Sequence, residues 1–164
     1  MSMEIDCLER CRFLQGFQPK HLEKLAALGL RGAFQKDEIV FRKDDTSSRF
    51  YLILSGRVAL EANAGTSVVV IETLHSGDVL GWSAVLGRPK QFQARALESV
   101  ETLAFEAAHV RDACDANPYF ARAFLETLLA SLAERLQSTR LQLALSSTPA
   151  GQRSFAGASE LRSA

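Results

Sequence analysis

The segment of residues 37–60, DEIVFRKDDTSSRFYLILSGRVAL, decides the fold class. It contains short runs rich in β-branched and aromatic residues, EIVFR, RFYLILSG and the start of RVALEA, with turn signals at Asp44-Asp45 and Ser55-Gly56 between them. Short apolar runs bounded by turn residues are typical of β-strands. The segment therefore predicts three consecutive strands joined by tight turns.

The same pattern extends outward in both directions and covers residues 30–106. LRGAFQ precedes the segment, and TSVVVIETL, FQARAL and VETLAF follow it. Further turn signals stand at Lys36-Asp37, Asn63-Ala64-Gly65 and Ser76-Gly77. Strands at this spacing, without intervening helices, predict an antiparallel β-roll or jelly roll.

Helical patterns flank the predicted roll. Residues 4–29 indicate two helices, the second of which starts at Pro19 and ends at Gly29. Residues 107–145 are helical again, and Asn117-Pro118 separates a short helix from a long one over about 119–145. The predicted fold class is thus α+β, a β-roll with N-terminal helices and a long C-terminal helix.

The chain of 164 residues is long enough for one domain, which we place at residues 1–145. Residues 146–164 are rich in Ser, Ala and Gly, which predicts a disordered tail. Lys and Arg equal Asp and Glu at 19 each, so the overall charge gives no reason to expect nucleic acid or an anionic membrane. Without an apolar run of about 18 residues or a signal-peptide pattern, we expect a cytoplasmic protein that does not enter a membrane.

The stretch of residues 75–97, HSGDVLGWSAVLGRPKQFQARAL, carries the clearest chemical signal. Gly81 opens a run of small residues, and the cations Arg88 and Lys90 follow it. Free N–H groups at the start of a helical turn, with cations behind them, are how a chain builds a phosphate pocket. Trp82 stands directly after the glycine, where such a pocket needs space.

Together with the element order, three phrases resemble the cyclic-nucleotide-binding domain of the bacterial catabolite-activator and Fnr (Crp/Fnr) family. FLQGFQPKHLEKLA is similar to the family's opening helices, DEIVFRKDDTSSRFYLILSGRVAL to its early strands, and GDVLGWSAVL to the start of its phosphate-binding cassette. The resemblance covers about residues 12–145. It implies an eight-stranded roll and a regulatory role in signal transduction.

The resemblance weakens at the residues that hold the ligand. In nucleotide-binding members a glutamate follows the cassette glycine and accepts from the ribose hydroxyl, whereas this chain has Trp82. Those members also hold the phosphate with an arginine beside a small hydroxyl residue. Here the equivalent pair is Lys90-Gln91, or Arg88 replaces Lys90 if the alignment gap falls elsewhere. Lysine offers a point charge where arginine offers a two-pronged fork.

In the family the long helix also closes over the bound base, which brings in three residues of its distal half. The resemblance therefore implies a ligand-binding set of Gly81, Trp82, Ser83, Ala84, Arg88, Lys90, Gln91, Ser138, Thr139 and Arg140. Trp82 either fills the pocket mouth as a hydrophobic plug or stacks on the ring of an unusual ligand. Arg88 and Lys90 are either solvated loop cations or phosphate contacts.

A regular row of leucines follows the long helix. Leu129, Leu132, Leu136, Thr139 and Leu143 repeat with spacings of 3, 4, 3 and 4, which is a heptad pattern. The row could pack on its own barrel, but Phe120, Phe124, Leu125 and Leu128 already provide a face for that contact. We therefore expect a homodimer through Leu129, Leu132, Leu136 and Leu143.

The sequence offers no catalytic or metal-binding pattern. His21, His75 and His109 lie on three different predicted elements, so we predict no metal site. No Gly-x-Ser-x-Gly elbow surrounds Ser83. We predict no enzymatic activity and no cofactor, other than a possible cyclic nucleotide or other anionic ligand.

The residues after the long helix contain no recognition helix, so we expect no direct DNA binding. The function that these observations favour is a non-enzymatic sensor or regulatory domain that dimerises and acts on an unknown protein partner. We expect its binding of cyclic AMP and cyclic GMP to be weak. The alternative is a dimeric protein-interaction scaffold of the same fold that binds no small molecule.

Overall fold

The computed structural model describes residues 2–9 and 11–147, so most of the predicted tail, residues 148–164, lies outside the described residues. Contacts divide the chain after Ser131 into two units. The first unit holds both sheets and most helices, and the second is the distal part of the long helix. That helix runs to Ser147, so residues 146 and 147, which we expected to begin the tail, are helical.

The helices begin and end where the sequence signals stand. Pro19 occupies the first turn of its helix, where its missing N–H costs nothing, and that helix ends at Gly29. Asn117 caps the long helix, because its Oδ1 accepts hydrogen bonds from the backbone N–H groups of Tyr119 and Phe120 at 3.1 Å. The helices are α1 (Ser2–Glu9), α2 (Pro19–Leu28), α3 (Ala107–Ala116) and α4 (Pro118–Ser147), with a 3₁₀ helix η1 (Arg12–Leu14).

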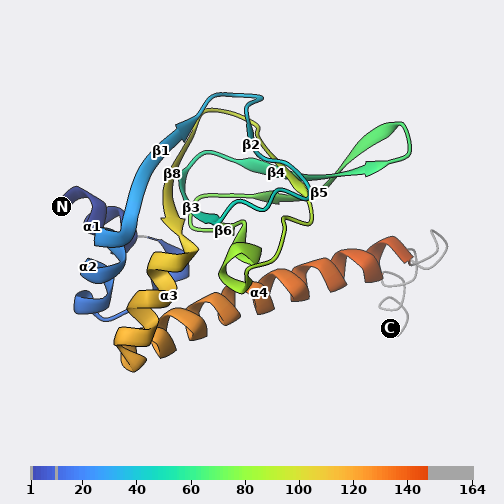
Figure 1. Ribbon diagram of the computed structural model, residues 1–164. Coiled ribbons are helices and arrows are strands. Elements are labelled where there is room, and N and C mark those ends of the chain that lie inside the picture. The colour runs from blue at the N-terminus through green and yellow to red at the C-terminus, as the bar shows by residue number, and fades with distance from the viewer. Residues whose placement is uncertain (1, 10, 148–164) are drawn as a thin grey trace, which may run out of the picture. The chain divides into compact units, whose positions relative to one another are not determined.

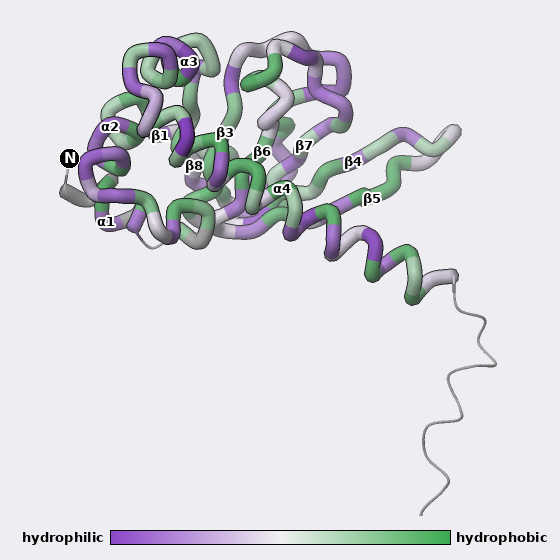
Figure 2. The backbone as a smooth tube through the Cα atoms, turned by 90° about the horizontal axis from the view of Figure 1, so that it is seen from below, coloured by the Kyte–Doolittle hydropathy of each residue, from purple (hydrophilic) through white to green (hydrophobic). Residues whose placement is uncertain are grey.

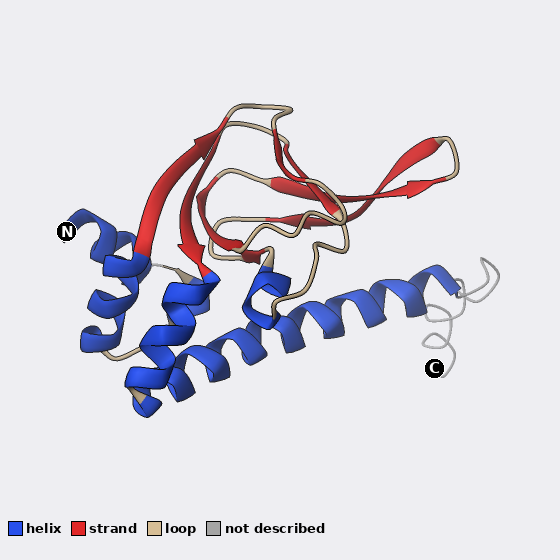
Figure 3. Cartoon of the chain, viewed as in Figure 1, coloured by secondary structure: helices blue, strands red, loops and turns tan. Residues whose placement is uncertain are grey.

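The strands form two antiparallel four-stranded sheets, with orders β1-β8-β3-β6 and β2-β7-β4-β5 (Figure 3). The predicted fold class is therefore confirmed. Seven strands match the predicted runs, whereas β6 has two residues and is too short to show a period in the sequence. The strands are β1 (Gly29–Phe34), β2 (Ile39–Phe41), β3 (Arg49–Ser55), β4 (Val58–Ala64), β5 (Ser67–Leu74), β6 (Val79–Leu80), β7 (Gln93–Ala96) and β8 (Val100–Glu106).

Apolar side chains from both sheets form the core of the roll. Gly56 makes the turn between β3 and β4 at φ +86°, and a Cβ there would lie 2.4 Å from the Ser99 carbonyl oxygen, so only glycine fits. This explains why Ser55-Gly56 is a turn signal. The core comprises Phe41, Ile53, Val58, Leu60, Leu74, Leu80, Ala94, Ala96 and Val100.

A chain of aromatic rings forms a second apolar layer between the sheet β1-β8-β3-β6 and the start of α4. Figure 1 shows α1, α2 and α3 at one end of β1 and β8. Phe50 of β3 stacks on Phe105 of β8 with ring centroids 5.1 Å apart. Phe124 of α4 lies 6.0 Å from Phe50 and 6.3 Å from Phe120. The first turns of α4 are thereby attached to the sheet.

The face of α4 that packs on the sheet is narrower than we predicted. Phe120, Phe124 and Leu128 are buried, but Leu125 is 52% exposed, so its predicted packing against the barrel is wrong. At about 100° per residue, Leu125 lies on the same side of the helix as Leu129 and Leu132. Leu125 therefore extends the heptad row by one position toward the N-terminus.

Candidate functional site

The cassette predicted at Gly81 is a short helical turn that two left-handed glycines delimit. The 3₁₀ helix η2 (Trp82–Leu86) starts after Gly81 at φ +75° and ends before Gly87 at φ +65°. Its first intrahelical bond runs from the Ala84 N–H to the Gly81 carbonyl at 3.2 Å. The N–H groups of Trp82 and Ser83 precede that bond, as in any helix N-terminus. The backbone geometry of the predicted turn is therefore present.

Neighbouring elements hold this turn on two sides, and a local hydrogen bond closes its end. β6 leads into it and pairs with Tyr51 and Leu52 of β3. The Arg88 N–H closes the end of η2 on the Ser83 carbonyl at 3.0 Å. From α3, an Arg111 guanidinium N–H approaches the Val85 carbonyl at 3.5 Å. The cassette thus contacts β3 on one side and α3 on another.

Lys90 is the unexpected residue of the site. Its side chain is only 2% exposed, and its ammonium donates to the carbonyl of Arg49 at 2.7 Å and to that of Gly81 at 2.9 Å. Its backbone N–H donates to the Asp45 carbonyl at 2.9 Å, and its carbonyl accepts from the Asp44 N–H at 2.8 Å. Lys90 therefore joins the segment before β7, the loop between β2 and β3, the start of β3 and the cassette.

The surroundings of the ammonium offset part of the cost of its burial. Burial lowers the pKa of Lys90, and the nearby Asp45 carboxylate opposes that shift. The Phe41 ring centroid lies 5.3 Å from Nζ, within the range of a cation–π contact. A Cβ on Gly81 would lie 3.2 Å from Nζ, so the glycine leaves room for the ammonium. The carbonyls supply partial negative charge to a cation that water does not reach.

The backbone carbonyl of Arg49 is fixed in place because Glu106 holds the side chain of the same residue. The Arg49 guanidinium forms an ion pair with Glu106 at the end of β8, and Glu106 also accepts a hydrogen bond from the Ser48 hydroxyl. These contacts lower the pKa of Glu106. One acceptor of the Lys90 ammonium is thus tied through its own side chain to the end of β8.

The other predicted residues of the cassette range from buried to exposed. Arg88 and Gln91 are exposed, and the Arg88 side chain forms no ion pair within the described part of the chain. The solvated-cation interpretation fits Arg88 but is wrong for Lys90. Ser83 and Ala84 are buried, whereas Gly81 and Trp82 are half-buried at the start of η2. Both interpretations of Trp82, as plug or as stacking platform, stay predictions.

Ser138, Thr139 and Arg140 lie on the distal part of α4, in the second unit. The Thr139 hydroxyl donates to the Arg135 carbonyl one turn earlier at 2.9 Å. Their contact with a bound base stays a prediction.

Sequence reasoning missed the partners of Lys90. Two of them, the carbonyls of Arg49 and Gly81, are backbone atoms and leave no residue-type signal. The proximity of Asp45 and Phe41 depends on how the loop between β2 and β3 folds back on the cassette. The sequence indicated only the position of Gly81, before the turn, and not its role as an acceptor of the Lys90 ammonium.

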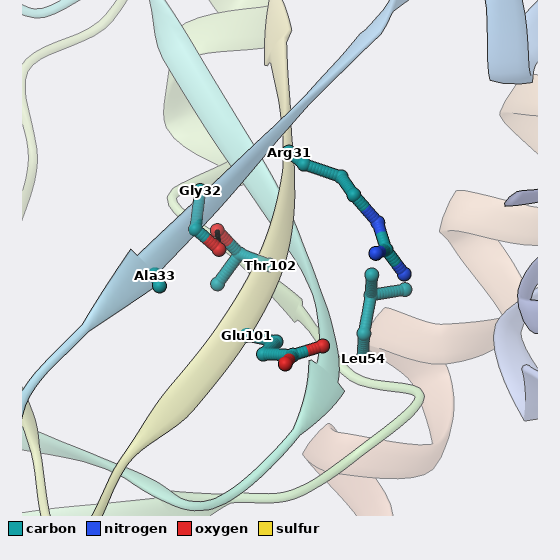
Figure 4. A pocket seen from close by; sticks show the side chains of 6 residues that line it. All are labelled: Arg31, Gly32, Ala33, Leu54, Glu101 and Thr102. Carbon is teal, nitrogen blue, oxygen red and sulfur yellow. Dashed lines mark hydrogen bonds between the residues drawn. The ribbon is translucent and has the colours of Figure 1, made fainter.

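A separate hollow of about 270 Å³ lies beside β1 and β8 and contains none of the predicted ligand-binding residues (Figure 4). The Thr102 hydroxyl within it already donates to the Gly32 carbonyl at 3.4 Å. Arg31 and Glu101 at its rim are exposed to solvent. These properties describe a depression of the sheet surface, and we keep the cassette as the candidate site.

Two general properties of the described residues bear on function. Nowhere in residues 2–9 and 11–147 do three His, Cys, Asp or Glu side chains gather as they would around a metal ion. None of the helices described in this range has the length and apolar character required to cross a bilayer.

The model of the cyclic nucleotide-binding domain family matches residues 31–117, which is more than half of the chain. The chain therefore belongs to the cyclic nucleotide-binding domain family. The match includes both sheets apart from the first two residues of β1, and it also includes the cassette and α3.

Solved structures share the fold at low sequence identity. A cyclic nucleotide-binding domain from Methylobacillus flagellatus superposes with a TM-score of 0.78 at 15% identity, covering 90% of this chain and 84% of that one. The catabolite activator protein of Thermus thermophilus gives 0.68 at 23% identity, over 82% of this chain and 62% of its own. The regulatory domain of Toxoplasma gondii PKA, solved with cAMP, gives 0.68 at 16% identity, over 81% and 49% respectively. No curated protein sequence matches the chain.

Replacing the buried ammonium tests its structural role. Lys90→Met keeps the apolar stem but leaves the Arg49 and Gly81 carbonyls without their charged donor. We expect the free energy of unfolding to fall by at least about 2 kcal/mol, since each buried unsatisfied acceptor costs roughly 1–3 kcal/mol. The matched control, Arg88→Met, removes an exposed cation two residues earlier and should change stability by less than about 0.5 kcal/mol. Urea unfolding measures both, and equal effects would contradict the assigned role.

Proposed function

We propose that this protein is a non-enzymatic regulatory domain that dimerises through α4 and binds cyclic AMP and cyclic GMP only weakly. The observation that carries the proposal is the Lys90 ammonium, which the Gly81 and Arg49 carbonyls hold beneath the start of the cassette. The fold and the family support the regulatory role. The structure of the Toxoplasma gondii regulatory domain with cAMP supports cyclic nucleotides as the class of ligand to test first.

Weak binding follows from the free energy that the phosphate and ribose contacts of a cyclic nucleotide would cost. A phosphate that recruited the Lys90 ammonium would have to compete with two carbonyl acceptors at 2.7 and 2.9 Å. Trp82 has no acceptor for a ribose hydroxyl, and leaving such a hydroxyl unsatisfied costs roughly 1–3 kcal/mol. Together these losses lower affinity by on the order of 10² relative to a cassette with glutamate and arginine.

The described contacts offer a route from the cassette to α4. A ligand that drew the ammonium away from the Gly81 carbonyl would free the start of η2. The far end of η2 contacts α3 through Arg111, and Asn117 joins α3 directly to α4. A shift of η2 would therefore bias the position of α3 and the start of α4, as in a two-state regulatory domain.

The dimer proposal rests on the row of apolar side chains along α4. In the first unit Leu125 and Leu129 are 52% and 67% exposed, although each is a large apolar residue. The row continues along the helix through Leu132, Leu136 and Leu143 with heptad spacing. Figure 2 shows hydrophobic and hydrophilic residues alternating along α4. A partner helix would bury this row, as in a two-stranded coiled coil.

A specific feature of β5 favours the alternative, a protein-interaction scaffold. β5 is the edge strand of its sheet, and Val68, Val69, Val70 and Ile71 are all about half exposed. Exposed apolar edge strands are prone to pair with other chains, and several recognition modules use them in this way. The scaffold would need no ligand in the cassette.

Cyclic nucleotide binding can be followed directly, because Trp82 is the only tryptophan of the chain. Titration of the purified protein with cyclic AMP should leave its tryptophan emission without a saturable change in the micromolar range, because the ribose and phosphate contacts are both impaired. Calorimetry checks for binding that the fluorescence does not report. A dissociation constant of micromolar or below would contradict the proposal of weak binding.

The double variant Trp82→Glu, Lys90→Arg separates the sensor from the scaffold. If the double variant gains cyclic AMP binding, the pocket still has the shape of a nucleotide-binding pocket and the wild type lacks only the side chains that contact the ribose and the phosphate. If neither protein binds any cyclic nucleotide, the scaffold is favoured. Circular dichroism of the variant confirms that it is folded before binding is judged.

A charge placed in the apolar row tests the dimer. Leu136→Asp would bury an unpaired carboxylate in the interface, at a cost of several kcal/mol, and should convert a dimer into a monomer. The matched control is Leu141→Asp, because Leu141 lies roughly 140° away around the helix and is also exposed. Sedimentation velocity at micromolar concentration should show a dimer for the wild type and for Leu141→Asp. A monomeric wild type would disprove the proposal.

A further inference from the structure

His21 is a buried titratable residue that the cassette does not use. It lies in the first turn of α2 and is 5% exposed. Neither Nδ1 nor Nε2 has a hydrogen-bond partner among the described residues, although both atoms are buried. A buried polar side chain normally finds a partner, so this arrangement requires an explanation.

Two aromatic rings, from two different segments, contact the imidazole. The ring centroids of Phe17 and Phe120 lie 5.8 and 5.9 Å from that of His21, both edge-on. Phe17 and Phe120 also meet each other at 6.3 Å, which closes a three-ring cluster. Because Phe120 stacks on Phe124, the cluster is the end of the aromatic chain that attaches α4 to the sheet. The neutral imidazole thus packs as an aromatic ring that joins α2, to which it belongs, to α4.

The charges around the cluster disfavour a proton on His21. Burial lowers its pKa, and Lys20 and Lys24 of α2 lower it further. Lys24 also lies over the Phe120 ring, with Nζ 5.3 Å from its centroid. An imidazolium inside the cluster would be a buried cation beside two others, without an acceptor.

An acceptor exists just outside the cluster. His21 lines a hollow of about 220 Å³ between the start of α2 and the first turns of α4, together with Gly16, Gln18, Lys20, Tyr119, Arg122, Ala123 and Glu126. Among these residues Glu126 alone carries a carboxylate. It is now bonded to Arg122 one turn earlier, with Nε and Oε1 2.7 Å apart. A protonated His21 that turned outward into this hollow could pair with Glu126.

We propose that His21 is a proton-operated latch between α2 and α4. In its neutral form the imidazole completes the ring cluster with Phe17 and Phe120 and holds the first turns of α4 in place. When His21 takes up a proton, it leaves the cluster for the hollow and pairs with Glu126, and the attachment of α4 loosens. The latch requires neither a cassette ligand nor a dimer, so its test is independent of the test of the proposed function.

The direction of the pH effect follows from the two states. The unfolded chain binds a proton at His21 with a pKa of about 6.5, whereas the closed latch binds it only at lower pH. The contribution of His21 to stability is therefore complete above about pH 6.5 and is lost as the pH falls below that value. Between pH 7.5 and 5.5 this single proton can lower the ratio of folded to unfolded protein by at most about tenfold, the limit for a folded state that takes up no proton at His21, and pairing with Glu126 makes the loss smaller than this limit.

The experiment compares urea unfolding of the wild type and His21→Phe at pH 7.5 and 5.5. Phenylalanine keeps a ring in the cluster and cannot titrate, so the variant should lack the share of the pH dependence that His21 contributes, which is at most about tenfold in the ratio of folded to unfolded protein. Other titrating groups are common to both proteins and cancel. An identical pH dependence would overturn the proposal. If His21→Phe does not fold, NMR titration of the wild-type imidazole decides, and a pKa at or above about 6.5 contradicts the latch.

Two further variants distinguish a latch from a passively buried histidine. Glu126→Gln removes the acceptor of the open state and should enlarge the loss of stability at pH 5.5. Arg122→Gln frees Glu126 for His21 and should reduce that loss. Both effects should disappear in the His21→Phe background, and their persistence there would show that Glu126 acts elsewhere. Amide exchange, corrected for its intrinsic pH dependence, should show loss of protection around Phe120 at pH 5.5 in the wild type only.

Discussion

The structure of the cassette depends on one buried charge, the ammonium of Lys90. A cation that water does not reach must be surrounded by acceptors, and here two backbone carbonyls provide them at 2.7 and 2.9 Å. Because those carbonyls belong to Arg49 and Gly81, the ammonium fixes the start of β3 against the start of η2. The glycine at 81 is required twice, for its left-handed backbone and for the room it leaves beside Nζ. A residue that could hold a ligand therefore also holds the protein's own backbone.

Two separate sets of contacts attach the helices to the roll. The cassette reaches α3 through Arg111, whereas the aromatic chain from Phe105 to His21 attaches the start of α4. In the proposed function a ligand would act on the first set, and in the proposed latch a proton would act on the second. Both sets meet at the junction of α3 and α4, where Asn117 caps the long helix. This junction is thus the part of the first unit on which either signal would act.

The fold could be predicted from the sequence because periodicity and turn residues encode it locally. The two-residue strand β6 was not predicted because it is too short to show a period. Leu125 was assigned to the wrong face because a residue count along a helix does not show which face a sheet covers. At the site, the glycines and the helical turn were predictable. The burial of Lys90 was not, because its acceptors are backbone atoms brought together only by the tertiary fold. His21 was read as one of three scattered histidines, and its ring partners come from segments about 100 residues apart.

The central claim is that the Lys90 ammonium is bound to the protein's own carbonyls, and NMR of lysine side-chain ammonium groups tests it most directly. Exposed ammonium protons, such as those of Lys43, exchange too rapidly with water to be observed. The account predicts one slowly exchanging ammonium signal that Lys90→Met removes and that cyclic AMP does not shift. A Lys90 signal that is absent, or that moves saturably as cyclic AMP is added, would contradict it.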